Sequence, residues 1–525
     1  MDDLCQQERS AALRAAGVHA IDVDDVRATL AAMVVHAGTH LPEDALRALR
    51  FGYEREGSDR GRSIYRQLLQ NVAGASAAGR PTCQDTGQAV VFVDLGEDVH
   101  LIGGSLDDAV NAGVAEGYSG FRKSIVRDAL FDRTNTRDNT PAVLHLRRVP
   151  GRTLRLSLAE KGYGSENKSA MVMFPEPNAG VDAVVRVVLE HLDRAGAGWC
   201  PPGILSVAVG GSFELAPLMA KRALLQPFDM DTLLERADRE PSSLSQHERL
   251  RVRLFHEVNA LGIGPQGLGG MTTVLDVKLS TGPTHIAGLP IAINMQCNKN
   301  HHLSAVLDGG GPITQFEAPD VSSWTVGIDL ESPEGARRLQ LPLSAQDVAS
   351  LEAGQRVLLS GRLLTGRDAA HKRMVELLDR GEPLPVDLRG QLIYYVGPVD
   401  PVAGEVIGPA GPTTASRMDP YVGRLMAEAG LLGSIGKGEH GRAATRAIQE
   451  QGGVFMVATG GAAWLQARSV VGVQTLAWPE LGTEAIRALE VVDFPAVVAL
   501  DTHGGDVHRQ GREAFAERNR HAQAP

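Results

Sequence analysis

Cysteine is scarce in this sequence, and its spacing excludes the commonest metal and redox motifs. The 525 residues include only four cysteines, which are Cys5, Cys83, Cys200 and Cys297. No two of them form a C-x-x-C pair of the kind that binds zinc or exchanges disulfides. Disulfides are not expected in a reducing cytosol. Three roles are left for each cysteine: a buried thiol, a nucleophile, or a ligand that folding brings to a shared site. A buried thiol is the usual role of a single cysteine.

Other absences narrow the class of protein. The sequence has no stretch of 18 or more apolar residues, and its start, MDDLCQQERS, lacks the charge and the apolar run of a secretory signal. The 63 Asp and Glu residues outnumber the 52 Lys and Arg residues, and the formal net charge of −11 argues against a broad nucleic-acid surface. A local cationic pocket is compatible with that total. We expect a cytoplasmic protein that binds neither membrane nor nucleic acid.

The residues that are present predict a large globular chain of two or three domains. Hydrophobic residues make up 43% of the chain and charged residues 22%. Helical and strand-like patterns alternate up to about residue 325, and the pattern then changes to short alternating runs, with a boundary between residues 318 and 340. The sequence predicts an α/β and α+β fold, with a mixed α/β N-terminal domain at 1–325, a smaller α/β C-terminal domain at 335–510 and a polar tail at 511–525.

Apolar periodicity predicts the individual elements. In the N-terminal part it predicts helices at 41–56, 63–79, 182–196 and 243–261, and strands at 89–95, 155–160, 204–211 and 273–279. In the C-terminal part it predicts helices at 367–381, 419–430, 462–469 and 483–490, and strands at 322–330, 337–343, 355–366, 391–398, 453–461 and 494–501.

Three of the four cysteines lie in turns rich in Gly, Pro or polar residues. Cys83 is in TCQDTG, Cys200 in GWCPPG and Cys297 in NMQCNKNHH. Three turn cysteines in one chain suggest three ligands of one cluster. A [4Fe–4S] cluster usually takes four cysteines, so three would leave one iron free to act as a Lewis acid on a substrate. A thiol nucleophile or a zinc site is equally compatible with the spacing.

Cationic side chains in glycine-rich stretches indicate an anionic ligand. Arg417 ends the hydroxyl-bearing loop GPAGPTTASRMD, and Lys437 stands between glycines in LLGSIGKGEHG. Arg122 in GFRKSIV and Arg367 in TGRDAAH are further candidates. Several converging cations suit a small dicarboxylate, because arginine binds carboxylates in a bidentate manner. A single arginine is more often a solvated surface charge.

Two apparent nucleotide motifs and a possible zinc site are rejected. GIGPQG at 262–267 follows a predicted helix rather than a strand, so it does not support a dinucleotide fold. SIGKG lacks the first glycine and the hydroxyl residue of a phosphate-binding loop. His301 and His302 have no partner pair at the spacing of a zinc site.

Ordered motifs along nearly the whole chain resemble class I fumarate hydratases, the iron–sulfur hydro-lyases that also include L-tartrate dehydratases. These motifs are CQDTG, FRKSIV, NTRDNTPAV, KGYGSENKS, CPPGILSVAVGG, GLGGMTTVLDVK, THIAGLPIAINMQC, GRDAAH, YYVGP, VIGPAGPTTASRMD and IGKG. The resemblance implies a fumarate hydratase of the tricarboxylic acid cycle type, usually a homodimer, with the two parts that are separate subunits in many members fused in one chain.

The resemblance also implies roles for particular residues. Cys83, Cys200 and Cys297 match the ligands of a [4Fe–4S] cluster whose fourth iron binds substrate, and Asp85 and Thr413 match the positions of proton transfer. The matches to substrate-contacting residues are Arg122, Gly164, His285, Arg367, Arg417 and Lys437. NKNHH after Cys297 and Tyr163 in KGYGSENK depart from the family pattern, and both departures concern the substrate more than the cluster.

Several alternatives to fumarate hydration stay open. Within the family, the substrate is fumarate, L-tartrate or a mesaconate-type acid. Outside it, the chain is an iron–sulfur sensor that binds a dicarboxylate without turnover, or a thiol- or zinc-dependent hydrolase. The Asp, Thr and Lys positions favour an enzyme, because a sensor needs no proton-transfer groups.

Overall fold

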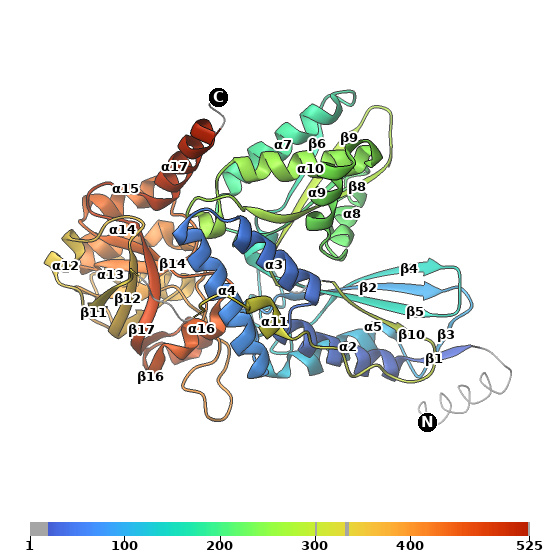
Figure 1. Ribbon diagram of the computed structural model, residues 1–525. Coiled ribbons are helices and arrows are strands. Elements are labelled where there is room, and N and C mark those ends of the chain that lie inside the picture. Colours follow the sequence, from blue (N-terminus) through green and yellow to red (C-terminus); the bar gives the residue numbers. More distant parts are fainter. Residues whose placement is uncertain (1–18, 300–301, 331–334, 523–525) are drawn as a thin grey trace, which may run out of the picture.

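The computed structural model describes residues 19–299, 302–330 and 335–522, with side chains up to residue 518, so Cys5 and His301 lie outside the described residues (Figure 1). Two four-stranded sheets with their helices form the N-terminal half, and a seven-stranded sheet forms the C-terminal part. This arrangement confirms the mixed α/β class. Within the described ranges, no helix is long and apolar enough to cross a membrane.

The first sheet has the strand order β10 (Leu303–Leu307), β5 (Leu154–Lys161), β2 (Gln88–Gly96) and β4 (Val143–Val149). The helices α2 (Val23–Thr39) and α5 (Leu106–Gly117) pack on one face, where Val91 and Val93 of β2 join Leu30 and Val34 of α2 in one buried cluster. A short parallel pair, β1 (Ala20–Asp22) and β3 (His100–Ile102), lies beside it. The apolar run that predicted a strand at 89–95 therefore forms the centre of this sheet.

The second sheet has the order β6 (Ala170–Phe174), β9 (Leu289–Cys297), β7 (Gly203–Gly211) and β8 (Val274–Thr284). One face is covered by α7 (Gly180–Ala195), α9 (Met230–Arg239) and α10 (Gln246–Ala260), and the other by α8 (Leu215–Ala223). A capping box of Ser245 and Glu248 begins α10, as a Ser start followed by Glu predicts. In the antiparallel pairing of β7 with β9, Gly203 lies opposite Cys297.

The C-terminal sheet closes on itself. Its strands are β11 (Arg337–Gln340), β12 (Arg356–Thr365), β13 (Leu392–Tyr394), β14 (Gly433–Gly436), β15 (Val454–Val457), β17 (Ile486–Leu500) and β16 (Val470–Ala477), in that order. The first five run parallel, and β17 pairs antiparallel with both β15 and β12. This second pairing closes β12, β13, β14, β15 and β17 into a ring, which encloses a cluster of buried apolar side chains.

Helices from both halves of the chain cover the outside of this ring. They include α13 (Asp368–Asp379), α14 (Asp419–Ala429), α15 (Arg442–Glu450) and α16 (Ala463–Arg468) from the C-terminal part, and α4 (Asp59–Ala77) from the N-terminal part (Figure 1). Helix α3 (Glu43–Arg55) packs against α4 and β8. Leu68 and Val72 of α4 share one buried cluster with Met418 and Phe455. The two halves therefore share a core along α4.

Two predicted elements of the C-terminal part are wrong, and the predicted polar tail is largely helical. Residues 322–330 were predicted as a strand, but Asp320 caps a short helix, α11 (Val321–Thr325), by accepting the Ser322 N–H at 2.9 Å. The helix predicted at 483–490 is a strand, because Ala488 and Leu489 pair with both β12 and β16. Most of the polar tail lies in α17 (Val507–Ala522).

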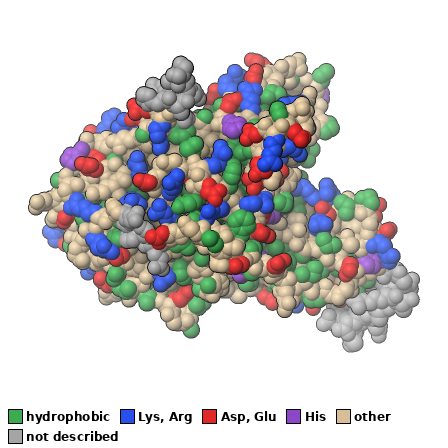
Figure 2. Space-filling model, in the orientation of Figure 1, with side chains coloured by type: hydrophobic (Ala, Val, Ile, Leu, Met, Phe, Trp, Pro, Cys, Tyr) green, Lys and Arg blue, Asp and Glu red, His purple; other side chains and the backbone are tan. Residues whose placement is uncertain are grey.

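Surface charge is mixed on the face that Figure 2 shows. Lys and Arg side chains alternate with Asp and Glu side chains over both halves of the molecule. This face therefore does not by itself indicate a binding site for an anion.

Candidate active site

The fold brings the three turn cysteines together. Cys83 precedes β2, Cys200 precedes β7 with a positive φ of 66°, and Cys297 ends β9. Each thiol acts electrostatically on another: Cys297 on Cys83, Cys83 on Cys200, and Cys200 on Cys297. Burial is the main cause that raises the pKa of all three, to about 11 for Cys83. A positive partner is therefore needed to make them thiolates at neutral pH.

Lys437 supplies this positive partner. Its buried Nζ donates to Cys200 Sγ at 2.7 Å. Burial alone would lower the pKa of Lys437, but Cys200, Cys83 and Asp85 outweigh burial and raise it. Gly460 leaves room for this contact, because a Cβ there would lie 2.7 Å from Cys200 Sγ. Lys437 is therefore charged, and it opposes the rise in the pKa of Cys200 without outweighing the effect of burial.

Asp85 lies beside the thiols as a charged carboxylate. Its Oδ2 accepts the Tyr163 N–H at 2.9 Å. Burial would raise the pKa of Asp85, but Arg122, Lys437 and Lys299 outweigh it and lower the pKa below the usual value for aspartate. Asp85 is therefore ionised at neutral pH and is available to accept a proton.

Two arginines meet at Gly397. Arg122 Nη1 donates to the Gly397 carbonyl at 3.3 Å, and a Cβ on Gly397 would collide with Arg367 Nη1. Arg367 is buried, and its Nε and Nη1 have no hydrogen-bond partner. Burial and the charge of Arg122 lower the pKa of Arg367 to about 10, and Glu484 lies 3.4 Å from its Nη2. Two adjacent guanidinium groups, of which Arg367 has unused donors, form a receptor for a carboxylate.

Thr413, Gly164 and Arg417 lie around this centre. Thr413 is buried, and its hydroxyl donates to the Tyr395 carbonyl at 3.1 Å, while its carbonyl accepts the Lys437 N–H. A Cβ on Gly164 would lie 3.0 Å from Lys437 Nζ. Arg417 is half-exposed and binds Asp368 through two bonds of 2.9 and 2.6 Å. Arg417 is thus at the outer side of the site.

His285 does not reach the site within one chain. It is exposed on the turn between β8 and β9, where its Nδ1 accepts the Ala287 N–H at 3.1 Å. Strand β9 separates this turn from Cys297, and a strand of its length spans about 25–30 Å. The fold therefore places ten of the eleven predicted site residues in one region of the molecule, and His285 lies outside that region.

Four parallel strands supply much of the C-terminal side of the site. Arg367 follows β12, Gly397 follows β13, Lys437 follows β14, and Gly460 follows β15. Because parallel strands end at the same edge of a sheet, the loops after them converge. The convergence of Arg367 and Lys437, 70 residues apart in sequence, follows from this topology.

Sequence reasoning missed a second layer of polar residues. Lys299 Nζ lies 2.5 Å from Glu160 Oε2 and donates to the Thr86 carbonyl at 2.9 Å. Gln84 Nε2 donates to the Pro412 carbonyl at 2.9 Å, and Gln266 Oε1 accepts the Gly460 N–H at 2.8 Å. Gln84 and Gln266 tie the N-terminal part to the C-terminal loops, whereas Lys299 anchors the segment after Cys297 within the N-terminal part. The available signal was the position of Gln84 and Lys299, which stand one and two residues after a turn cysteine.

The three thiols can be compared with the ligand set of an iron–sulfur cluster. In the described part of the chain, no three His, Cys, Asp or Glu side chains are placed to hold one metal ion. The three cysteines of an iron–sulfur cluster each bind a different iron, so they need not meet around one point. The donor set here consists of three thiols with a lysine at one of them, which fits a cluster with three cysteine ligands.

His371 supports the Arg367 loop and gives the fold a pH dependence. Its Nδ1 donates to the Arg367 carbonyl at 2.9 Å, and burial lowers its pKa to about 4. In the unfolded chain the pKa of His371 is 6.5, so the neutral ring makes its full contribution to the free energy of unfolding above pH 6.5. This contribution is lost as the pH falls from 6.5 towards 4, because the unfolded chain then binds a proton that the folded chain does not. We expect the free energy of unfolding to fall by about 2 kcal/mol between pH 7.5 and pH 5 from this residue. Urea denaturation should show a smaller fall for His371→Gln, and an equal fall in both proteins would contradict the assignment.

Buried thiols, an ionised carboxylate and converging cations together define an enzyme site for a small anionic substrate. The chain belongs to the fumarate hydratase family. The family model described as fumarate hydratase (fumerase) matches residues 27–306, and the model of the fumarase C-terminus matches residues 310–511. The chain is accordingly an enzyme of the hydro-lyase class.

Relatives with assigned names align over most of the chain. Fumarate hydratase 2 of Leishmania major is 31% identical over 470 residues, which cover 86% of this chain and 81% of the relative. The anaerobic class I fumarate hydratase of Escherichia coli K12 is 30% identical, covering 87% and 84%. A putative L(+)-tartrate dehydratase subunit alpha of Methanocaldococcus jannaschii is 30% identical, covering 50% of this chain and 90% of the relative.

Proposed function

We propose that this chain is a class I fumarate hydratase that catalyses the reversible hydration of fumarate to (S)-malate. The observation that carries the proposal is the convergence of three thiols, Lys437 and the ionised Asp85 with Arg122 and with the buried Arg367, whose Nε and Nη1 have no hydrogen-bond partner. L-tartrate dehydratase or a mesaconate-type hydratase is the alternative. Fumarate is favoured because relatives named fumarate hydratases align over 86% and 87% of the chain, including both of its parts.

We propose that Cys83, Cys200 and Cys297 hold a [4Fe–4S] cluster. When bound, the cluster supplies an iron without a cysteine ligand as a Lewis acid for the hydroxyl at C2 of malate. The chain's own contribution is a cation at one ligand, because Lys437 lies 2.7 Å from Cys200 Sγ and favours the thiolate that an iron ion binds. Gly460 leaves the space that this sulfur occupies.

The remaining residues bind the acid and move one proton. Arg122 and Arg367 bind a substrate carboxylate, which relieves the repulsion between two adjacent guanidinium groups. Asp85 takes the proton from C3 in dehydration and returns it in hydration. Thr413 assists Asp85, because a threonine hydroxyl alone is too weak a base. Lys437 stabilises the negative charge that develops next to the carboxylate.

Two further contacts limit the substrate's size and position. The missing side chain of Gly164 leaves room at Lys437 Nζ, so a substrate atom can approach the ammonium group there. Arg417 lies at the outer side, held by Asp368, and can receive the second carboxylate of a dicarboxylate. A monocarboxylate would leave one of these cations without its partner.

We further propose a cytoplasmic homodimer. The exposed turn with His285 is too far from Cys297 for this histidine to contact substrate in its own chain. For His285 to contact substrate, it would have to reach the active site of a second copy of the chain. Residues 1–325 would carry the cluster, and residues 335–510 would contribute substrate-binding residues such as Arg367 and Lys437. The 27–306 and 310–511 ranges of the two family models support this division.

Anaerobic reconstitution tests the proposed function. We expect about four iron and four sulfide per chain, turnover of fumarate above that of L-tartrate and mesaconate, and the mass of a dimer in light scattering. Fumarate turnover far below tartrate turnover would make the chain a tartrate dehydratase. A cluster without turnover of any of the three acids would indicate a sensor. Activity in air that zinc chelation abolishes would indicate a hydrolase.

A further inference from the structure

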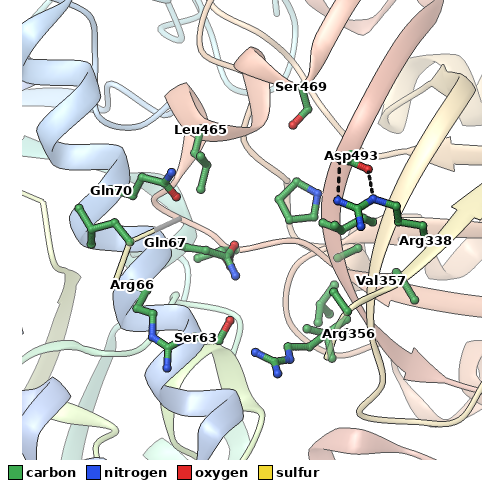
Figure 3. Close-up of a pocket in the computed structure, with 18 residues that line it drawn as sticks. Ser63, Arg66, Gln67, Gln70, Arg338, Arg356, Val357, Leu465, Ser469 and Asp493 are labelled. Atoms are coloured by element: carbon green, nitrogen blue, oxygen red, sulfur yellow. Dashed lines mark hydrogen bonds and ion pairs between the residues drawn. The ribbon is translucent and has the colours of Figure 1, made fainter. Parts of the chain in front are cut away.

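A second cavity lies between the two halves of the chain, outside the proposed active site. It has a volume of about 390 Å³, which is large enough for a small metabolite. One wall is α4, with Ser63, Arg66 and Gln67, and the opposite wall is formed by β12 and β17, with Arg356 (Figure 3). None of the eleven predicted site residues lines it.

Two arginines in this cavity have no carboxylate partner in the described part of the chain. Figure 3 shows the guanidinium group of Arg356 pointing across the cavity towards Ser63 and Arg66 on α4. Arg66 Nε is buried and has no hydrogen-bond partner. Within the described ranges, neither Arg66 nor Arg356 forms an ion pair with a carboxylate. Facing cations in a partly enclosed space repel each other, and an oxyanion between them removes that repulsion.

A third arginine at the same cavity is already neutralised. Arg338 binds Asp493 through bonds of 3.2 and 3.3 Å, with both side chains at the cavity. The unmatched positive charge is thus confined to the side of the cavity between Arg66 and Arg356. The rest of the lining includes apolar side chains such as Val357, Leu465 and Val497. A ligand with an oxyanion at one end and a small, less polar group at the other fits a cavity that is cationic on one side and partly apolar on the other.

The cavity wall is connected to the thiol site. Gln67 accepts the Thr459 hydroxyl at 2.8 Å, and both side chains line the cavity. The next residue, Gly460, donates its N–H to Gln266 at 2.8 Å on the other side of the loop, and this is the glycine whose absent Cβ leaves space for Cys200 Sγ. A ligand that contacts Gln67 or Thr459 therefore acts on the segment that supports a proposed cluster ligand.

We propose that this cavity is a second ligand site, which binds a small oxyanion-bearing metabolite between Arg66 and Arg356. The ligand carries a phosphate or a carboxylate, because both are bound by paired guanidinium groups. Occupancy of the cavity is coupled to substrate affinity through Thr459 and Gly460. The coupling is reciprocal, so the substrate changes the affinity of the second ligand by the same factor.

Calorimetry on the reconstituted holoenzyme tests the binding. Succinate at saturation first occupies the catalytic centre, and inorganic pyrophosphate and citrate are then titrated in separate experiments. We expect one saturable site per chain for at least one of them; pyrophosphate binding alone assigns a phosphate ligand, and citrate binding alone a carboxylate ligand. Absence of saturable binding of both anions would overturn the proposal.

Matched variants locate the site. Arg66→Gln and Arg356→Gln should each weaken binding about 10- to 100-fold, and Arg356→Lys, which keeps the charge, should weaken it less than Arg356→Gln. Arg338→Gln should bind within about threefold of the wild type, because Arg338 is already paired. Wild-type binding by Arg356→Gln, or an equal loss in Arg338→Gln, would overturn the assignment to this cavity. Circular dichroism of each variant establishes that it is folded.

A third measurement tests the coupling. The dissociation constant of succinate is measured with and without the bound anion, and we expect it to change at least threefold in the wild type and not in Arg356→Gln. An unchanged constant in the wild type would overturn the coupling while leaving the ligand site established. These readouts do not depend on which acid the enzyme turns over, so their failure is distinct from failure of the proposed function.

Discussion

Replacing Asp85 with asparagine should lower kcat by about 10³-fold or more, with the cluster content unchanged. The amide oxygen can still accept the Tyr163 N–H, so the loop keeps its 2.9 Å anchor. It cannot accept the substrate proton, and it gives Arg122, Lys437 and Lys299 no negative charge to face. The measurement is kcat on fumarate with iron and sulfide determined on the same preparation.

The matched control for Asp85 is Thr413→Ala. Thr413 donates to the Tyr395 carbonyl at 3.1 Å and shares no hydrogen bond with Asp85 in the described part of the chain. If the hydroxyl assists proton transfer, this variant should lose about 10²-fold in kcat. Near-normal turnover of Thr413→Ala beside an inactive Asp85→Asn would remove Thr413 from the mechanism. Wild-type kcat in Asp85→Asn would remove Asp85.

Lys437→Met should have the second large effect, and it should act on both the cluster and the turnover. The variant removes the donor 2.7 Å from Cys200 Sγ and one of the charges that lower the pKa of Asp85. Without that cation, burial raises the thiol pKa values further, so less thiolate is available for iron. We expect kcat/KM to fall about 10³-fold or more and iron content to fall below that of the wild type.

Lys221 provides the comparison for this lysine. Lys221 is buried nearly as deeply as Lys437, and it forms an ion pair with Glu166 on α6 (Tyr163–Glu166). Among the described interactions, it makes no contact with the three thiols. Lys221→Met should therefore retain its iron and sulfide. An equal loss of iron in both variants would indicate general destabilisation, and full iron with full activity in Lys437→Met would contradict the role given to Lys437.

The sequence predicted best the elements whose local signals agree with their packing. Helix α10 has a capping box and an apolar face, and β2 is a continuous apolar run, so both lie where expected. Residues 483–490 have helical apolar spacing, but the same side chains pair with β12 and β16 in the closed ring. A pairing between strands more than 100 residues apart leaves no local signal, which is why tertiary context decided this segment.

The residues of the candidate site also fall into two groups, those that the sequence alone could predict and those that it could not. Turn cysteines, glycine-flanked Lys437 and Arg367 could be found from residue type and setting, because such residues are rarely placed there for packing. The contact of Lys299 with Glu160 could not be found, since 139 residues separate them and each alone resembles a surface charge. The distance of His285 from Cys297 also required the β8–β9 turn to be seen in place.

The closed ring bears on whether such an enzyme needs one polypeptide chain or two. All three thiols come from strands and loops before residue 300, whereas Arg367, Lys437 and Gly460 are carried on one edge of the ring. The two sets meet through packing and hydrogen bonds such as that of Asn71 with the Gly461 carbonyl at 3.1 Å, and none of these contacts needs a continuous backbone. Two separate polypeptides could form the same junction as a quaternary contact, which agrees with a relative that is named an alpha subunit and matches half of this chain.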